Sequence, residues 1–444
     1  MANQAILRIG REISQLQQGS DLSLAVACKE EDIQNIKALI IGPAETPYEF
    51  GFFEFDIKFP KEYPASPPKV ESVTTNGGRT RFNPNIYACG KVCLSTLGTW
   101  RGESGEQWSS AQGLESILIS IQSLMSSNPY ENEPGYEDAK GEADLKAMAK
   151  YVEKIYHETL RITVIQRLED ALGIQADGAV IPPSRSFSDS DEDEDANPPF
   201  EPFHDLCKRR FLWYYDSYMN IIKEQEANHP VGSRFERMPF EVGGNSMDGR
   251  YNYPQMKQRV ELIKDAIMQE THGWVAEGLK AKANDTRISV SLQRQYEQIM
   301  EDLKLKKNFT IDISLDDGNP FVWQLTFFGR PMTHMDGGIF RIKICLSPHF
   351  PEEQPRAFVQ TSIFHRRVSQ AGVLCYSSKK LEDMRSHVEA IVAALEDESP
   401  TYDPRATVNP EASKLFWGST EQKKQYNRLL RRSAQRSIEY VNCK

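Results

Sequence analysis

The stretch that decides the fold is IKALIIGPAETPYEFGFFEFDIKFPKEYPASPPKV, residues 36–70. It opens with an apolar run at 36–41 and continues with FFEFDIKF at 52–59, where apolar and polar residues alternate as in a half-buried strand. The YPASPP segment at 63–68 is rich in proline, which lacks the N–H that a central strand needs. The order predicts two β-strands followed by an irregular segment.

Helices are expected on both sides of these strands. Apolar residues recur at helical spacing in residues 4–17, in 111–125 and in a longer stretch from about 143 to 172. The predicted first domain is therefore 1–172.

Beyond residue 172 the composition changes. Residues 173–199 contain IPPSRSFSDSDEDEDANPP, which is poor in apolar side chains and rich in like charge, so they are expected to form an acidic, disordered linker. Residues 200–283 form a predicted helical extension rich in aromatic side chains. Residues 284–444 begin with another helical pattern and then become strand-rich, which predicts a further domain.

The strand-rich end of the chain repeats the beginning. Four identical residue pairs stand 287 positions apart, and two further pairs stand 282 apart once five residues of the loop TTNGGRT (74–80) are removed. The first four pairs are Gly42 and Gly329, Phe53 and Phe340, Pro64 and Pro351, and Pro68 and Pro355; the other two are Asn83 and His365, and Cys93 and Cys375.

The overall composition argues against some classes of function. The chain has 444 residues with a net charge of −10, which argues against nucleic-acid binding as its main task. No apolar run reaches membrane-spanning length, so no membrane attachment is expected. Seven cysteines without a CxxC pair or a Cys/His cluster indicate reduced thiols and no metal site, and hence a cytoplasmic or possibly nuclear protein.

Charge is unevenly distributed along the chain. Residues 188–195 are strongly acidic, and the predicted last helix is basic. Both features fit either a solvated surface or a docking role. The basic residues are Lys423, Lys424, Arg428, Arg431, Arg432 and Arg436.

The segment RFNPNIYACGKVCLSTLGTW, residues 81–100, carries candidate chemistry. Asn83-Pro84-Asn85 is expected to form a turn, and Cys93 follows Asn85 by eight residues, so a loop can bring the amide near the thiol. A cysteine hydrolase needs a base beside its thiol, yet the first histidine of the chain is His157. Acyl transfer between thiols needs no such base, and an amide that stabilises the oxyanion accelerates a reaction by roughly a hundred- to a thousandfold.

At these residues the chain resembles the ubiquitin-conjugating enzymes, over about residues 4–270. The resemblance is closest to the large members charged by the non-standard ubiquitin-activating enzyme, a group also linked to an additional ubiquitin-like modifier. The matching motifs are GPAETPYEFGFFEF (42–55), FPKEYPASPPKV (59–70), FNPN (82–85), GKVCLS (90–95), WSSAQ (108–112), ISIQSLMSSNPYENEPGYE (119–137), IYHETLRITV (155–164), FLWYYDSY (211–218) and RYNYPQMKQRVELIK (250–264).

The resemblance implies an α+β fold, present twice: a four-stranded antiparallel meander with flanking helices, the two copies being joined by the acidic linker and the helical region. It implies that Cys93 carries the thioester and that Asn85 supplies the amide of the family's His-Pro-Asn turn. Asn83 stands where the family has the histidine. Residues 128–134 would form a gate near the acceptor lysine, with Glu131, Asn132 and Glu133 as candidates for orienting it. A buried structural thiol is the alternative interpretation of Cys93.

The resemblance also implies partner surfaces. Arg8 and Arg11 on the first helix are candidate contacts for the activating enzyme, and a solvated helix face is the alternative. Ligases would grip two loops. Ala65 replaces a large apolar residue there and Ser110 replaces a proline, so we expect weak or selective ligase docking. The loop candidates are Pro64 and Ala65 in the first loop, and Trp108, Ser109, Ser110 and Ala111 in the second.

The second copy resembles the same fold through IFRIKICLSPHFPEEQP (339–355) and VNPEASKLFWGSTEQKKQYNRLLRRSAQ (408–435). Its turn reads His365-Arg366-Arg367 and so lacks both the proline and the functional asparagine, although Cys375 keeps the cysteine position. Two interpretations remain open. Cys375 is either a second thioester site or a buried cysteine of a scaffold, and the scaffold is favoured.

The function that the resemblance implies is the transfer of ubiquitin or a ubiquitin-like protein from Cys93 to lysine or to a ligase. The expected partners are this modifier, the activating enzyme, ligases and protein substrates. No cofactor is expected on the chain itself, which shows no P-loop; the activating enzyme would use ATP and magnesium. A non-catalytic ubiquitin-binding adaptor of the same fold is the alternative function.

Overall fold

The computed structural model describes residues 2–19, 21–102, 105–181, 200–241, 247–306 and 309–442. The chain divides into two compact units. The first unit consists of Met1–His204 with Ile222–Arg259, and the second consists of Asp205–Ile221 with Val260–Lys444. The predicted acidic tract at 188–195 lies outside the described residues.

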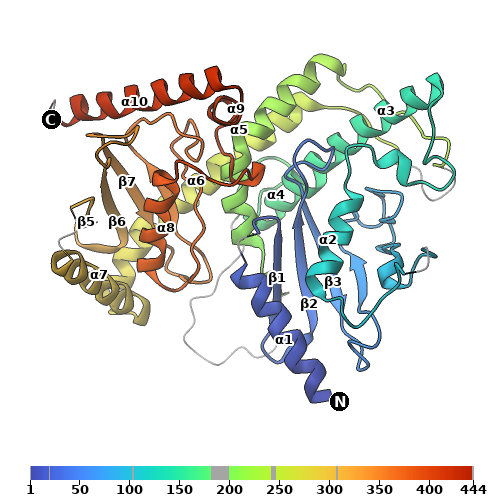
Figure 1. The fold of residues 1–444 in the computed structure, drawn as a ribbon, viewed down its shortest axis with the longest axis horizontal. Helices are drawn as coiled ribbons and strands as arrows, with labels where there is room; N and C mark the ends of the chain where they lie inside the picture. Colours follow the sequence, from blue (N-terminus) through green and yellow to red (C-terminus); the bar gives the residue numbers. More distant parts are fainter. Residues whose placement is uncertain are drawn as a thin grey trace. The chain divides into compact units, whose positions relative to one another are not determined.

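The first unit contains a four-stranded antiparallel sheet in the order β1-β2-β3-β4 (Figure 1). The predicted strands at 36–41 and 52–59 correspond to β2 and β3, and the helix predicted at 4–17 is α1. The elements are α1 (Ala2–Gln18), β1 (Leu24–Lys29), β2 (Asp32–Ile41), β3 (Phe52–Lys58), β4 (Lys69–Ser72), α2 (Leu114–Leu124), α3 (Glu142–Glu158), the π-helix η3 (Thr159–Gln166) and α4 (Arg167–Leu172). Short 3-10 turns lie at Ser95–Leu97 (η1) and Pro129–Asn132 (η2).

The core of the first unit lies on one face of this sheet. Alternate strand residues such as Ile40, Phe53 and Phe55 pack with apolar residues of α1 and α2. Burying these side chains supplies most of the driving force, at about 25 cal/mol for each Å² of apolar surface.

The other face of the sheet is also covered, which corrects the prediction of a half-buried strand at 52–59. Phe52 and Glu54 are both fully buried at 2% exposure or less. The backbone N–H of Phe52 donates to the Thr163 hydroxyl on η3 at 3.2 Å, and Glu54 accepts from Arg167 on α4. The helical stretch at 142–172 therefore forms a second wall against the sheet, which strand alternation alone could not indicate.

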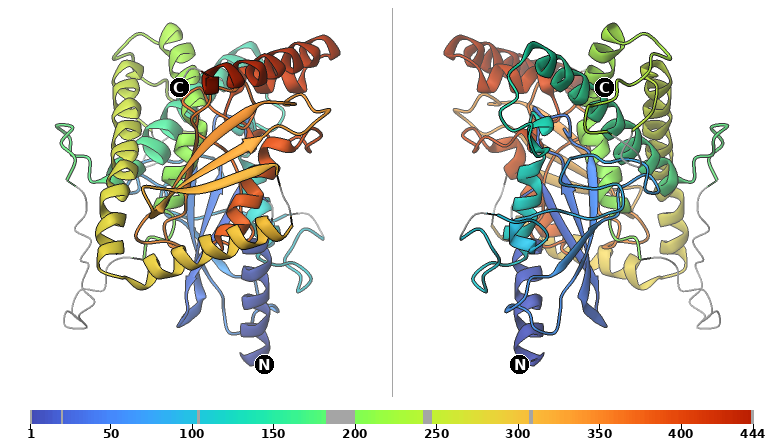
Figure 2. Two further views of the ribbon diagram at one scale, coloured as in Figure 1. Left: turned by 90° about the vertical axis from the view of Figure 1, so that its left-hand side faces the viewer. Right: turned by 90° about the vertical axis from the view of Figure 1, so that its right-hand side faces the viewer.

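The second unit repeats this architecture with a sheet in the order β5-β6-β7-β8 (Figure 2). The α+β prediction of two four-stranded antiparallel meanders with flanking helices is confirmed. The elements are α7 (Arg287–Leu305), β5 (Ile311–Asp316), β6 (Asn319–Phe328), β7 (Ile339–Cys345), β8 (Arg356–Val359), α8 (Met384–Glu396), the 3-10 turn η5 (Pro404–Ala406), α9 (Pro410–Trp417) and α10 (Thr420–Asn442).

The two sheets agree residue by residue at the spacing found in the sequence. Ile40 pairs with Phe53 in the first sheet, and Phe327 pairs with Phe340 in the second. Gly42 is required at its position because a Cβ there would lie 1.7 Å from the Tyr48 carbonyl oxygen. Gly329 has the same relation to the carbonyl oxygen of Met335, also at 1.7 Å.

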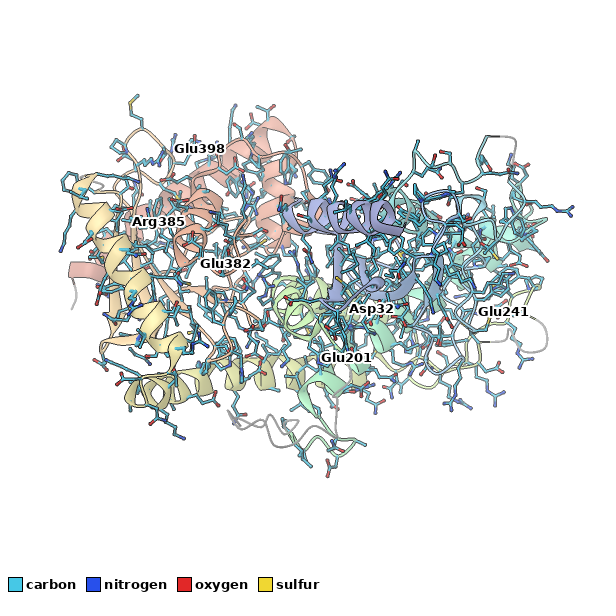
Figure 3. All side chains as sticks on the ribbon, turned by 90° about the horizontal axis from the view of Figure 1, so that it is seen from below. Asp32, Glu201, Glu241, Glu382, Arg385 and Glu398 are labelled. Atoms are coloured by element: carbon cyan, nitrogen blue, oxygen red, sulfur yellow. The ribbon has the colours of Figure 1, made fainter. Side chains whose placement is uncertain are left out.

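The predicted helical extension consists of α5 (His204–Asn228) and α6 (Tyr253–Ala283), and the two units share both helices. In the first unit, the segment between these helices is tied to α3. The ammonium group of Lys154 lies 2.6 Å from both carboxylate oxygens of Glu241, which is labelled in Figure 3. No helix in the described part of the chain is both long enough and apolar enough to cross a membrane.

Candidate active site

The loop after β4 brings the predicted pair Asn85 and Cys93 together. The backbone N–H of Cys93 donates to the Asn85 carbonyl oxygen at 2.8 Å, and the Asn85 side-chain amide donates to the Cys93 carbonyl oxygen at 3.2 Å. The amide is thus held beside the residue whose sulfur would react. Cys93 itself is 3% exposed, and the neighbouring Cys89 is exposed.

Asn83, which stands at the histidine position of the family turn, is fully buried and fixes the turn. Its side-chain oxygen accepts from the Asn85 backbone N–H at 2.8 Å. Its amide nitrogen donates to the Leu124 carbonyl oxygen at 2.7 Å and to the Tyr48 hydroxyl at 3.1 Å. These bonds join the turn to the end of α2, so the backbone around Asn85 is preorganised.

The predicted gate contacts this turn through Asn132. The Asn132 amide donates to the Asn83 side-chain oxygen at 3.3 Å and to the Leu124 carbonyl oxygen at 3.0 Å. Glu131, the neighbouring candidate, is exposed. The structure therefore holds Asn132 in the turn network and leaves Glu131 accessible to an incoming amine; their roles toward a lysine stay predictions.

Arg81 joins the turn to the gate, and sequence reasoning missed it. Its guanidinium donates to the Pro84 carbonyl oxygen and lies 3.0 Å from the carboxylate of Glu133. It also lies 4.4 Å above the ring of Tyr87, and only 5% of the residue is exposed. A charged residue before a turn is usually exposed, so the sequence gives no reason to expect Arg81 to be buried. Its partner Glu133 is 52 residues away and is brought to it only by folding.

Hydrogen bonds hold some of the residues of the predicted partner surfaces. The indole N–H of Trp108 donates to the Pro64 carbonyl oxygen at 2.8 Å, which joins the two loops. Arg8 donates to the carbonyl oxygens of Ser110 and Gln112 at 2.7 and 2.6 Å, so its guanidinium joins α1 to the second loop. The remaining candidates are exposed: Arg11, Ala65, Ser109, Ser110 and Ala111.

The second copy keeps the backbone of this loop but not its chemistry. The backbone N–H of Cys375 donates to the Arg367 carbonyl oxygen at 2.9 Å, as Cys93 does to Asn85. Arg367 instead directs its guanidinium at the sulfur of Cys375, at 3.9 Å. Burial and the two neighbouring arginines lower the pKa of His365 to about 3, so this imidazole is neutral at physiological pH.

Cys375 is completely buried. Burial raises the pKa of its thiol, and the nearby guanidinium groups of Arg367 and Arg210 offset this only in part. Arg210 is on the part of α5 that belongs to the second unit, as is Tyr214, whose hydroxyl donates to the Arg405 carbonyl oxygen at 2.9 Å. Because the thiolate is the nucleophile, a buried thiol with a raised pKa is a weak one.

Comparison with known proteins identifies the family of this fold. The sequence profile described as "Ubiquitin-conjugating enzyme" matches residues 8–158 and, separately, 291–432. Ubiquitin-conjugating enzyme E2 Z of Homo sapiens is 37% identical over 276 residues, which cover 62% of this chain and 67% of the relative. The Homo sapiens protein named Dual E2 ubiquitin-conjugating enzyme/E3 ubiquitin-protein ligase BIRC6 is 43% identical over 154 residues, which are 34% of this chain and 3% of that protein.

Both matched regions coincide with a four-stranded meander, and the first contains the Asn85–Cys93 loop. In the described part of the chain, no cluster of three or more His, Cys, Asp or Glu side chains offers a metal site. The two profile matches, the E2 Z similarity and the repeated sheet show that the chain belongs to the ubiquitin-conjugating enzyme family.

Proposed function

We propose that this enzyme accepts ubiquitin or a ubiquitin-like protein as a thioester on Cys93. The observation that carries the proposal is the loop in which the Asn85 amide lies 3.2 Å from the Cys93 carbonyl oxygen. A side-chain amide next to Cys93 supports the proposal, because negative charge develops on the modifier's carbonyl oxygen during acyl transfer and a hydrogen-bond donor can stabilise it.

Two exchanges at the modifier's terminal carbonyl make up the reaction. In the first, the Cys93 thiolate attacks the thioester on the activating enzyme; a new C–S bond forms, the old one breaks, and the donor cysteine leaves as thiolate. In the second, a lysine amine attacks, an amide bond forms, Cys93 leaves as thiolate, and the amine loses a proton to solvent or to a carboxylate. In this scheme the activating enzyme uses ATP and magnesium, and this chain needs no cofactor.

Cys375 takes no part in this proposal. Its complete burial, its raised pKa and the replacement of the amide by Arg367 support a second copy that serves as a scaffold. The first copy alone would carry the modifier.

A charging assay tests the proposal. The full chain is incubated with an activating enzyme, ATP and each of several modifiers, with both known classes of activating enzyme. We expect one adduct that reducing agent removes. In Cys93→Ser we expect at most an oxyester, which resists reducing agent, because a serine oxygen replaces the sulfur.

Two results would contradict the proposal in different ways. A wild-type chain that binds modifiers yet forms no adduct under any of these conditions would be an adaptor. An adduct that reducing agent still removes from Cys93→Ser would move the reaction to another cysteine, Cys375 first among them.

A further inference from the structure

A stripe of arginines lies on α10 in the second unit. Arg428, Arg432 and Arg436 follow at intervals of four residues, so they share one helix face and are about 6 Å apart along its axis. All three are exposed. Among the side chains that the structure describes, which on this helix end at Ile438, no carboxylate pairs with any of the three, whereas Lys424 pairs with Glu421 at 2.8 Å.

Two of these arginines line a groove of about 560 Å³, which we call the α10 groove. Arg432 and Arg436 form one wall, and the loop at 359–372 after β8 forms the other. Figure 2 shows α10, in red, running past the strands of the second sheet. Apolar side chains of Ile363, Phe364, Val368 and Leu429 also line the groove, and Glu411 is the one carboxylate among the described lining residues.

The α10 groove is preformed. The Ser433 hydroxyl accepts from the Phe364 backbone N–H at 3.0 Å, which fixes the loop against the helix. One turn later, Ser437 accepts from the Ile339 backbone N–H at 2.8 Å, which fixes the helix against β7. Because both walls are held in place, a ligand would not have to order them on binding.

The spacing of the charges points to a particular ligand. Side chains on one face of an extended peptide recur about every 6.8 Å, since each residue rises about 3.4 Å. Successive arginines of the stripe are separated by about 6 Å, so carboxylates at alternate peptide positions can meet successive guanidinium groups. A polyphosphate is a poorer match, because it has no apolar side chains to contact Ile363, Phe364 and Leu429 in the groove lining.

We propose that the α10 groove docks an extended acidic segment of a partner protein, with carboxylates at alternate positions facing Arg432 and Arg436 in the groove and Arg428 just beyond it. The apolar lining takes the side chains between them. This surface makes no use of Cys93, so it can hold or fail independently of the thioester proposal.

A binding measurement with the full chain tests the docking surface. The probe is a fluorescein-labelled peptide, Asp-Val-Asp-Val-Asp-Val-Asp, and the readout is anisotropy at 50 and 200 mM salt. Replacing all three stripe arginines by glutamine should weaken binding about eightfold, roughly twofold for each exposed charge contact. Glu411→Gln should strengthen it by about twofold, because a repelling carboxylate is removed.

A matched variant controls for net charge. Lys423→Gln/Lys424→Gln/Arg431→Gln removes the same three charges from the same helix but leaves the stripe intact, and it should change affinity by less than about twofold. Equal losses in the two triple variants would overturn the proposal, as would an unbound probe at 50 mM salt.

Other ligands would show themselves in the same assay. Tighter binding of single-stranded RNA or of phosphatidylserine vesicles through the same arginines would overturn the peptide assignment. Binding of the probe only after residues 188–195 are deleted would assign the groove to the chain's own acidic segment, and would equally overturn the docking of a partner.

Discussion

At residue 85, one side-chain amide closes the loop and, in the proposed reaction, would also stabilise the oxyanion. Its donation to the Cys93 carbonyl oxygen at 3.2 Å is one bond among several that hold the loop, because Asn83 independently anchors the turn. The chemical and structural contributions of Asn85 can therefore be separated.

Asn85→Ala should lower the rate of discharge from Cys93 to lysine by roughly a hundredfold or more, the usual cost of losing an oxyanion donor. The unfolding temperature should change little, since the bonds of Asn83 remain. Single-turnover discharge and thermal unfolding, measured side by side, check this. A variant that discharges normally would remove Asn85 from the chemistry.

The pairing of Asn85 with Cys93 could be anticipated from sequence, because eight residues around a proline turn are enough to bring the chain back. Arg81 could not be, since its two partners, Pro84 and Glu133, lie on different segments and only the folded chain brings them to one guanidinium. The assignment of Arg8 as a surface contact was likewise made without the carbonyl oxygens that it bonds in the folded chain.

At the scale of elements, β3 and the wall formed by η3 and α4 meet at a buried charge. Glu54 accepts from Lys37 on β2 at 2.6 Å and from Arg167 on α4, and it is 2% exposed. Burial alone would raise the pKa of this carboxyl, but Arg167 and Lys37 together bring it below its ordinary value.

A depressed pKa gives stability that is present above the unfolded-state value, about 4.3, and is lost as the pH falls through the folded-state value. Glu54→Gln should therefore lower the free energy of unfolding at pH 7 by roughly 2 kcal/mol and flatten its decline as the pH falls below about 5. Chemical denaturation across this range measures both. Asp56→Asn, on the same strand with a side chain 58% exposed, should change stability by less than about 0.5 kcal/mol.

A second buried pair joins α3 to the segment before α6. The side chain of Lys154 is 0% exposed and that of Glu241 is 3% exposed. Burial lowers the pKa of Lys154, and Glu241 offsets this only in part. The pair connects two segments, and it stabilises the fold only while both charged side chains are present.

Lys154→Met should destabilise the protein by about 3 kcal/mol, because it leaves a carboxylate buried without its cation. Adding Glu241→Leu should recover much of that loss, since an apolar pair needs no desolvation. Denaturant unfolding of the two variants measures both changes in stability. A double variant no more stable than the single one would show that the Glu241 carboxylate stabilises the protein through other contacts as well.

Most helices and strands could be predicted from the sequence, because the spacing of apolar residues shows which face of a single element is buried. It placed α1, α2 and the helical stretch at 142–172 well, and it placed β2 and β3. It predicted a half-buried β3 because no local pattern reveals that a helix covers the outer face, with Thr163 contacting Phe52 from 111 residues away. The π-helical geometry of η3 was equally hidden, since apolar spacing does not distinguish a π-helix from an α-helix over eight residues.

At the scale of the whole molecule, the cysteines differ in exposure, although Cys93 and Cys375 are both buried, at 3% and 0% exposure. Cys89, beside the proposed site, is exposed, whereas Cys207, Cys345 and Cys375 are buried in the second unit. Burial raises the pKa of Cys345 to about 11, and it raises that of Cys375 as well.

Iodoacetamide at pH 7.5 should therefore label Cys89 within minutes and leave Cys375 unmodified until the protein is unfolded in denaturant. Peptide mapping by mass spectrometry distinguishes them, and Cys345 serves as the buried reference. Labelling of Cys375 at a rate near that of Cys89 would contradict the scaffold interpretation of the second copy.

The alternation of chain segments between the two units limits how this protein can be divided. Residues 205–221 belong with the second unit although they precede 222–259, which belong with the first. No single cut separates the halves: a terminal fragment long enough to complete the first half also carries a piece of the second. Truncation or proteolytic nicking would leave both products with exposed apolar surface. The boundaries between the units fall inside a helix, α5 or α6, so isolating either half would require cutting through regular secondary structure.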